Sequence, residues 1–267
     1  MRRRVLTVGV ATTAGLLLGG CSSSSTTTGS APTSAKSSAS KSSSAPVSGT
    51  VNVFAAASLK ETFTKLGRLF EAAHPGVTGV FNFGPSSGLA TQITQGAPAD
   101  VFASASGKNM DKVVTAGKAV SSTYFASNSM EIAVPANNPA KIKTLADVAR
   151  LGVKLALCQS AVPCGTTAYQ VFSNAKLPLK PVTQEVDVKA VLTKVALGEV
   201  DAGIVYVTDV QAAGEKVRGV KIPAAVNAST NYPISTLTEA PNKATAQAFT
   251  DYVLSADGAG VLTAAGF

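Results

Sequence analysis

Short apolar stretches alternate with amphipathic stretches from residue 51 to the end of the chain. The apolar stretches predict buried strands, whereas stretches with apolar residues at every third or fourth position predict helices. The predicted strands span residues 51–57, 77–83, 100–105, 129–134, 154–157, 202–207 and 217–222. The predicted helices span residues 59–73, 87–95, 108–116, 145–151, 166–174, 188–197 and 242–255. This alternation predicts an α/β protein with largely parallel sheets.

The first predicted strand runs through three alanines into Ser58. Ser58 and Glu61 have the S-x-x-E spacing of a capping box, so a helix is predicted to begin at Ser58. The backbone N–H groups at a helix N-terminus have no intrahelical partners and carry partial positive charge, so they can hold an anion. An ordinary capped helix without a ligand explains the same residues.

The turn after the second predicted strand carries Ser86 in the sequence Gly84-Pro85-Ser86-Ser87-Gly88. This sequence fits the G-x-S-x-G nucleophile elbow of a serine hydrolase. A serine nucleophile needs a base, and in that fold the histidine follows the serine along the chain. The only histidine, His74, precedes Ser86 by twelve residues and lies in a sequence typical of a helix-ending turn. A secreted serine hydrolase with a lysine as its base is the less favoured alternative.

Cys158 and Cys164 are separated by five residues, between a predicted strand and a predicted helix. In an exported protein such a pair most simply forms a disulfide. The bond would close a short loop and constrain the unfolded chain by about 2 kcal/mol. Two buried free thiols are the alternative. One histidine and two cysteines do not make a metal-ligand cluster, and no P-loop or dinucleotide-binding motif occurs, so no metal and no cofactor are expected.

The first 21 residues have the organisation of an export leader. Arg2, Arg3 and Arg4 precede an apolar run that is too short to span a bilayer comfortably. The run ends in Leu18-Gly19-Gly20-Cys21, which resembles the lipobox of bacterial lipoproteins, and this resemblance implies that Cys21 is lipidated. A plain signal peptide or membrane anchor is the alternative. Residues 22–50 are rich in serine and threonine and predict a disordered tether.

The charge of the chain changes once the leader and tether are set aside. Five of the 23 basic residues precede Val51 and none of the 15 acidic residues does, so the remaining part carries a net charge of +3. This charge is too small to indicate nucleic-acid binding, and it is compatible with a small anionic ligand. The length of 267 residues allows one or two domains.

Six segments together resemble the periplasmic molybdate-binding proteins of ABC transporters, a family of type II solute-binding proteins. The segments follow the family's order and are residues 53–59, 84–89, 90–105, 162–165, 187–189 and 203–206. The resemblance covers residues 51–267. It implies a two-lobed, periplasmic-binding-protein-like fold of type II, with the ligand cleft between the lobes. Residues 51–132 and 223–267 would form one lobe, and residues 133–222 the other.

The resemblance also implies a set of oxyanion contacts, which fall on Ser58, Ser86, Cys164, Val188 and Tyr206. Ser58 and Ser86 would each use the hydroxyl and the backbone N–H, and Tyr206 its hydroxyl. Cys164 and Val188 would use the backbone N–H alone. Many members have alanine where this chain has Cys164, and a backbone contact tolerates that change. Neutral donors of this kind suit a tetrahedral dianion, which only accepts hydrogen bonds.

The resemblance therefore implies a receptor that captures molybdate or tungstate and delivers it to the membrane permease and ATPase subunits of an ABC importer. The protein would be a monomer without enzymatic activity, anchored through Cys21 to the outer face of the cell membrane. A receptor for another oxyanion, such as sulfate, is the alternative within this class. Asp187 lies beside Val188 and would offer an acceptor to protonated phosphate, so the donor pattern only leans against phosphate.

Overall fold

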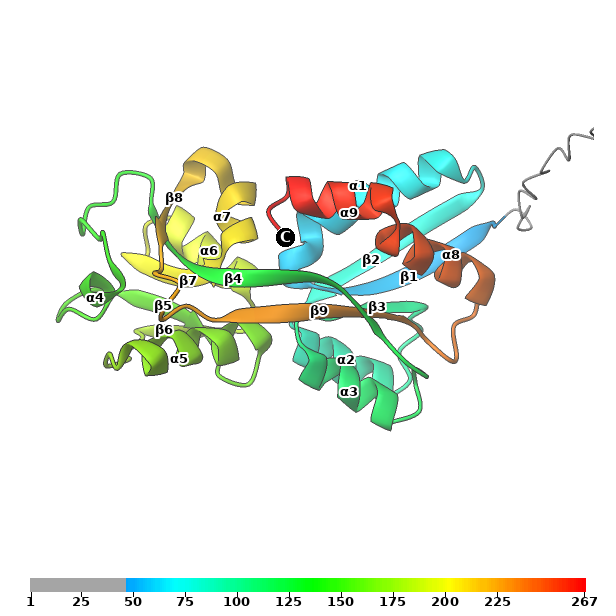
Figure 1. Cartoon of the computed structure of the whole chain (residues 1–267), viewed down its shortest axis with the longest axis horizontal. Helices are drawn as coiled ribbons and strands as arrows, with labels where there is room; N and C mark the ends of the chain where they lie inside the picture. Colours follow the sequence, from blue (N-terminus) through cyan, green and yellow to red (C-terminus); the bar gives the residue numbers. More distant parts are fainter. Residues whose placement is uncertain (1–46) are drawn as a thin grey trace, which may run out of the picture. The chain divides into compact units, whose positions relative to one another are not determined.

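The computed structural model of the protein describes residues 47–267 (Figure 1). The predicted leader, the predicted lipidation site at Cys21 and residues 22–46 of the predicted tether lie outside the described residues. The predicted end of the tether at residue 50 is wrong, because strand β1 begins at Gly49. The carbonyl oxygen of Ser48 accepts hydrogen bonds from Asn242 Nδ2 at 2.6 Å and Thr245 Oγ1 at 2.8 Å, so the chain is already fixed there.

Nine strands within residues 47–267 form one hydrogen-bonded sheet in the order β2-β1-β3-β9-β4-β7-β5-β6, with β8 paired to β4. The strands are β1 (Gly49–Ala56), β2 (Val77–Gly84), β3 (Val101–Ala103), β4 (Thr123–Pro135), β5 (Leu155–Cys158), β6 (Thr183–Glu185), β7 (Ala202–Tyr206), β8 (Val217–Lys221) and β9 (Ser229–Thr236). The outer strands pair in parallel, β1 with β2 and β3, and β5 with β6 and β7. All pairs that involve β4 or β9 are antiparallel. The predicted α/β class is confirmed, but parallel pairing is limited to the two outer parts of the sheet.

Strand β4 links the two halves of the sheet. Residues 123–129 pair with β9, and residues 130–135 pair with β7 and β8. The strand predicted over residues 129–134 covers only the second, more apolar half. The sequence does not predict β9, because that strand is mostly polar and contains Pro233, which cannot donate to a ladder. Strands β4 and β9 lie side by side where the halves of the sheet meet (Figure 1).

The buried apolar side chains form separate cores on the two sides of this strand pair. One core takes its buried residues from positions 130 to 222. Two smaller cores take theirs from positions 51 to 119 and 232 to 262. We refer to residues 130–228 as lobe 2 and to the rest of the described chain as lobe 1. The limits predicted from the sequence for this lobe, residues 133 and 222, stay a prediction.

Helices cover both lobes and mostly follow the predicted pattern. They are α1 (Lys60–Ala73), α2 (Ser86–Thr94), α3 (Gly107–Thr115), α4 (Leu145–Val148), α5 (Pro163–Ala175), α6 (Val188–Ala196), α7 (Val207–Ala213), α8 (Lys243–Leu254) and α9 (Ala256–Ala264). Helix α1 buries Phe63, Leu66 and Phe70 in lobe 1, which is its predicted apolar face. The sequence does not predict α7, which follows β7 directly, or α9, which only Ser255 separates from α8. Within residues 47–267, no helix combines the length and apolar character needed to cross a membrane.

The start of α1 differs from the prediction. A 3₁₀ turn, η1 (Ala57–Leu59), precedes the helix, and no side chain caps it. Ser58 and Glu61 do not form the predicted capping box, because Ser58 Oγ lies 2.9 Å from the hydroxyl of Tyr232 instead. By contrast, Asp187 caps α6 as its position suggests, since its Oδ1 accepts a hydrogen bond from the N–H of Ala190 at 2.9 Å.

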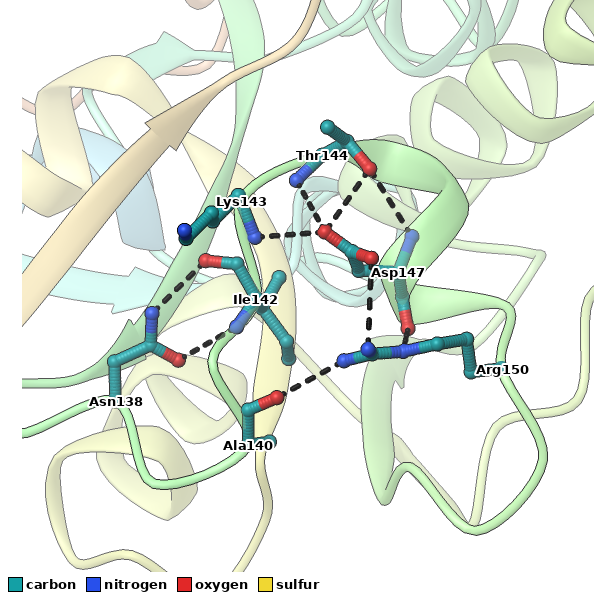
Figure 2. A network of polar contacts seen from close by, with 7 residues as sticks. All are labelled: Asn138, Ala140, Ile142, Lys143, Thr144, Asp147 and Arg150. Atoms are coloured by element: carbon teal, nitrogen blue, oxygen red, sulfur yellow. Dashed lines mark hydrogen bonds and ion pairs between the residues drawn. The ribbon is translucent and has the colours of Figure 1, made fainter.

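A local polar network holds the connection around α4 in lobe 2 (Figure 2). Thr144 and Asp147 form a capping box at the start of the helix. Arg150 donates a hydrogen bond to the carbonyl oxygen of Ala140 at 2.9 Å. This connection contributes no residue to the cavity described below.

Candidate functional site

A small cavity of about 20 Å³ lies between the lobes, where strands end and helices begin. Its lining includes all five predicted contact residues, namely Ser58, Ser86, Cys164, Val188 and Tyr206. The first two belong to lobe 1 and the other three to lobe 2. The remaining lining residues are Ala56, Ala57, Gly84, Ala105, Pro163 and Asp187. The structure thus brings together residues that are widely separated along the chain, and their role in binding stays a prediction.

The size of the cavity limits what it can hold. A single water needs roughly 10–15 Å³ of such space, so about 20 Å³ leaves room only for a very small ligand. A nucleotide, a sugar or a peptide does not fit in this arrangement of the lobes. Most of the side chains beside the predicted contacts are alanine, glycine or proline, so backbone groups can approach a ligand closely.

Ser86 is oriented as a hydrogen-bond donor. It is buried at the first position of α2, and its Oγ accepts a hydrogen bond from the backbone N–H of Ala105 at 2.9 Å. A serine hydroxyl has one hydrogen and two acceptor positions. Because Ala105 fills one acceptor position, the hydroxyl hydrogen of Ser86 stays available to a ligand in the cavity.

Backbone amides from two helices of lobe 2 also reach the cavity. Cys164 and Val188 stand in the first turns of α5 and α6, before the first intrahelical hydrogen bonds, which are made by the N–H groups of Thr166 and Val191. Their own N–H groups therefore have no intrahelical partner. Pro163 precedes Cys164 at the first position of α5, where the missing N–H of proline costs nothing. Two helix N-termini thus direct donors and partial positive charge into the cavity.

Tyr206 supplies a buried hydroxyl without a protein partner. Its side chain is 1% exposed, and its hydroxyl makes no hydrogen bond within residues 47–267. Burial, and then the negative charge of Asp209, raise the pKa of the phenol well above its usual value, so the group stays protonated. A buried hydroxyl without a hydrogen-bond partner lowers the stability of the fold unless a water or a ligand supplies the partner. In the cavity lining, this hydroxyl could donate to any group that accepts a hydrogen bond.

The loop that carries Cys164 is held rigidly. A disulfide joins Cys158 to Cys164 with a Cα–Cα distance of 5.8 Å, which is the pairing that the sequence predicts. Gly165 lies so close to the preceding loop that a Cβ atom there would overlap the carbonyl oxygen of Gln159. The bond and the glycine together fix the first turn of α5 against the end of β5.

An ion-pair network that the sequence does not predict borders the cavity. Lys189 is the second residue of α6. Its Nζ lies 2.8 Å from Asp209 Oδ1 and 2.7 Å from Glu61 Oε2. Asp209 is fully buried, and its Oδ2 accepts a hydrogen bond from the backbone N–H of Tyr206 at 3.1 Å. Burial raises the pKa of Asp209 and the charge of Lys189 lowers it, with burial dominating. Each member of the network lies within three residues of a predicted contact, and that proximity is the only signal in the sequence.

The hydrolase alternative lacks its base. His74 packs its ring against Phe70, with 4.4 Å between ring centroids, at the end of α1 and outside the cavity lining. No lysine, arginine or histidine of the described part of the chain lines the cavity. Within the same residues, no group of three or more histidine, cysteine or acidic side chains is placed to hold a metal ion.

The fold and the cavity define a two-lobed binding protein for a small solute. The chain belongs to the bacterial extracellular solute-binding protein family, whose model matches residues 51–267. Its members are extracytoplasmic binding components of transport systems and not enzymes, so the serine hydrolase alternative is wrong.

Three comparisons show what the chain is similar to. It is 43% identical to the molybdate-binding protein ModA of Mycobacterium tuberculosis over 227 residues, which cover 84% of this chain and 87% of the relative. It superimposes on the periplasmic molybdate-binding protein of Azotobacter vinelandii with a TM-score of 0.73 and 22% identity, covering 81% of this chain and 97% of that one. The sulfate-binding protein SubI of M. tuberculosis matches with a TM-score of 0.69 and 17% identity, covering 82% and 86% of the two chains. At 22% and 17% identity, the two structural matches support a shared fold and nothing more.

Proposed function

We propose that this protein captures molybdate, or the closely similar tungstate, outside the cytoplasm and delivers it to the permease and ATPase subunits of an ABC importer. The observation that carries the proposal is a cavity of about 20 Å³ into which both lobes direct neutral donors, with no basic side chain in its lining. The 43% identity to a protein named molybdate-binding, over most of both chains, supports the choice of anion.

The donor chemistry favours a fully deprotonated tetrahedral anion. Hydroxyl and amide donors in a buried cleft replace the water around such an ion, and charge-assisted hydrogen bonds are stronger than neutral ones. The carboxylate of Asp187 also lines the cavity, but its Oδ1 is engaged with the N–H of Ala190. A protonated phosphate carries a hydrogen and needs an acceptor for it, and Asp187 is the acidic residue in the lining that could accept. The donor pattern therefore favours a deprotonated anion without ruling out phosphate.

Sulfate is the second candidate. The fold is shared with a sulfate-binding protein, and sulfate presents the same four acceptor oxygens around a smaller centre. The donors of the cavity cannot separate the two ions by chemistry, so the choice depends on the distance between the lobes when they are closed. The 43% identity to a relative named molybdate-binding is the observation that favours molybdate over the smaller sulfate.

Purified protein titrated with molybdate, tungstate, sulfate and phosphate, by calorimetry or intrinsic fluorescence, tests the proposal. We expect molybdate and tungstate to bind with similar affinity, and at least about tenfold more tightly than sulfate or phosphate, a difference of about 1.4 kcal/mol. Preference for sulfate would replace the leading ion by the second candidate. Failure to bind any of the four would overturn the oxyanion function.

The lipobox-like sequence Leu18-Gly19-Gly20-Cys21 supports a further part of the proposal, namely a monomeric receptor tethered to the outer face of the cell membrane through a lipidated Cys21. Stable anchoring requires more than one acyl chain. Cys21→Ala is expected to release the protein from the membrane fraction. Unchanged partitioning of this variant into detergent would contradict the lipid anchor.

A further inference from the structure

Tyr232 lies outside the predicted contact set but touches it in both lobes. It belongs to β9, one of the two strands at the junction of the lobes, and it is fully buried. Its hydroxyl lies 2.9 Å from Ser58 Oγ in lobe 1. Its ring stands edge-on to the ring of Tyr206 in lobe 2, with 6.2 Å between centroids. Two of the three hydroxyl-bearing residues in the cavity lining, Ser58 and Tyr206, thus lie against one side chain.

We propose that Tyr232 is a positioning residue of the oxyanion site, whose hydroxyl donates to Ser58 Oγ and thereby turns the hydrogen of Ser58 towards the anion. The inference rests on the proposed function, because it requires a tetrahedral anion at Ser58. Tyr232 itself does not line the cavity.

The argument follows from the single hydrogen of a serine hydroxyl. If Ser58 donated to Tyr232, it would present only lone pairs to the cavity, and these repel an anion. If Tyr232 donates instead, Ser58 accepts that bond and keeps its own hydrogen for the ligand. Burial holds the pKa of Tyr232 well above its usual value, so its hydroxyl always has a proton to donate. Successive hydrogen bonds in this direction polarise and strengthen one another.

Aromatic packing fixes the ring that carries this hydroxyl. The ring of Phe267, the last residue of the chain, packs edge-on against Tyr232 at 5.3 Å between centroids, and Phe125 of β4 packs at 6.2 Å. A tyrosine held on several sides has little rotational freedom, so its hydroxyl has a fixed position. Phenylalanine would fill the same space but leave Ser58 Oγ without its partner.

A double-mutant cycle between Ser58 and Tyr232 tests the proposal. Affinity is measured for the parent, Tyr232→Phe, Ser58→Ala and the double variant, with whichever of molybdate, tungstate, sulfate and phosphate the parent binds most tightly. Tyr232→Phe alone is expected to weaken binding about 3- to 10-fold, the value of one net hydrogen bond. In the Ser58→Ala background the same change should weaken binding less than about twofold, because the hydroxyl that Tyr232 orients is gone.

Ser235→Ala is the matched control. Ser235 lies on the same strand, is buried, and donates to the carbonyl oxygen of Ser121 at 2.6 Å, away from the cavity. Its loss should lower the melting temperature without changing affinity.

A purely structural role for Tyr232 predicts another pattern, in which Tyr232→Phe lowers the melting temperature but leaves affinity unchanged, or weakens binding equally in both backgrounds. Either result would overturn this inference while leaving the proposed function intact. If the parent bound none of the four anions, the proposed function would fail first and the inference with it.

Discussion

Lys189 on α6 and Glu61 on α1 lie 2.7 Å apart in an ion pair that joins lobe 2 to lobe 1. Glu61 stands three residues after Ser58, and Lys189 directly follows Val188, so the pair spans the cleft beside the cavity. Asp209 holds the same ammonium group at 2.8 Å from within lobe 2. Because only Glu61 belongs to the other lobe, its bond to Lys189 is the part of the network that would break if the lobes moved apart.

Glu61→Gln should therefore weaken oxyanion binding through faster dissociation. The Glu61 side chain is half exposed, so the pair contributes about 0.2–1 kcal/mol, which is at most about a fivefold change in affinity. The effect should shrink at high salt. Stopped-flow dissociation rates at two ionic strengths provide the measurement.

Glu239→Gln serves as the control for this variant. Glu239 pairs with Lys118 at 2.8 Å, but both residues belong to lobe 1. Its loss should leave the dissociation rate unchanged. Equal rates for the parent and for Glu61→Gln would show that the pair between the lobes does not resist opening.

Lys189→Ala should destabilise the protein strongly. The change leaves the fully buried carboxylate of Asp209 without its cation, and breaking a buried pair in this way costs about 3–5 kcal/mol. Urea unfolding of the ligand-free protein provides the measurement. Lys194→Ala removes a partly exposed lysine of the same helix that pairs with Glu185 and Glu199, and it should have a much smaller effect because surface ion pairs contribute little. A parent-like unfolding midpoint for Lys189→Ala would contradict this role of the pair.

The loss in Lys189→Ala should also depend on pH. Burial raises the pKa of Asp209 in the folded protein, and removing Lys189 raises it further, since the lysine charge lowers it. A raised carboxyl pKa means that the folded state binds its proton more tightly than the unfolded chain, so stability is gained as pH falls through the folded pKa. The deficit of the variant should therefore be largest near neutral pH and shrink in acid. A constant deficit between pH 7 and pH 4 would contradict this.

Gly165→Ala should damage the loop that presents the amide of Cys164. An added Cβ overlaps the carbonyl oxygen of Gln159, so backbone must move. We expect a loss of stability of about 1–3 kcal/mol, in the range for overpacking, together with weaker oxyanion binding. Gly260→Ala in α9 is the control, because its Cβ would meet nothing within 4 Å. That change should be neutral or stabilising, since alanine favours helix. Parent-like stability and affinity of Gly165→Ala would remove the case for a fixed loop.

Reduction of the Cys158–Cys164 disulfide should lower stability by about 2 kcal/mol in the loop-entropy model, because the closed loop is short. The backbone N–H of Cys164 survives reduction, so affinity should fall less than in a variant that loses a donor. Urea midpoints with and without reductant measure the first effect, and titration measures the second. Alkylation of both thiols in native, unreduced protein would show that the bond does not form.

Sequence patterns marked residues that line this cavity because those residues sit at local junctions between strands and helices. Ser86, Cys164 and Val188 occupy the first turns of helices, where the residue types and the family's short segments mark the position directly. The partner of Ser58 could not be found in this way, since Tyr232 lies 174 residues away on a strand that reads as polar. The same distant contact explains why the expected capping box does not form, because Ser58 Oγ pairs with Tyr232 and does not cap the helix. The burial of Asp209 could not be predicted from the sequence either, because it depends on how α6, α7 and α1 pack together.

The affinity of Tyr206→Phe tests the central claim, an oxyanion held between the lobes by buried neutral donors. The Tyr206 hydroxyl has no partner within residues 47–267, so its removal should leave the melting temperature of the ligand-free protein unchanged or raise it. The same change should cost about 1.5–3 kcal/mol of molybdate binding, a tenfold to hundredfold loss. Tyr169→Phe, in the same lobe but outside the cavity lining, should leave affinity unchanged. Molybdate binding by Tyr206→Phe as tight as that of the parent would contradict an oxyanion site in this cavity.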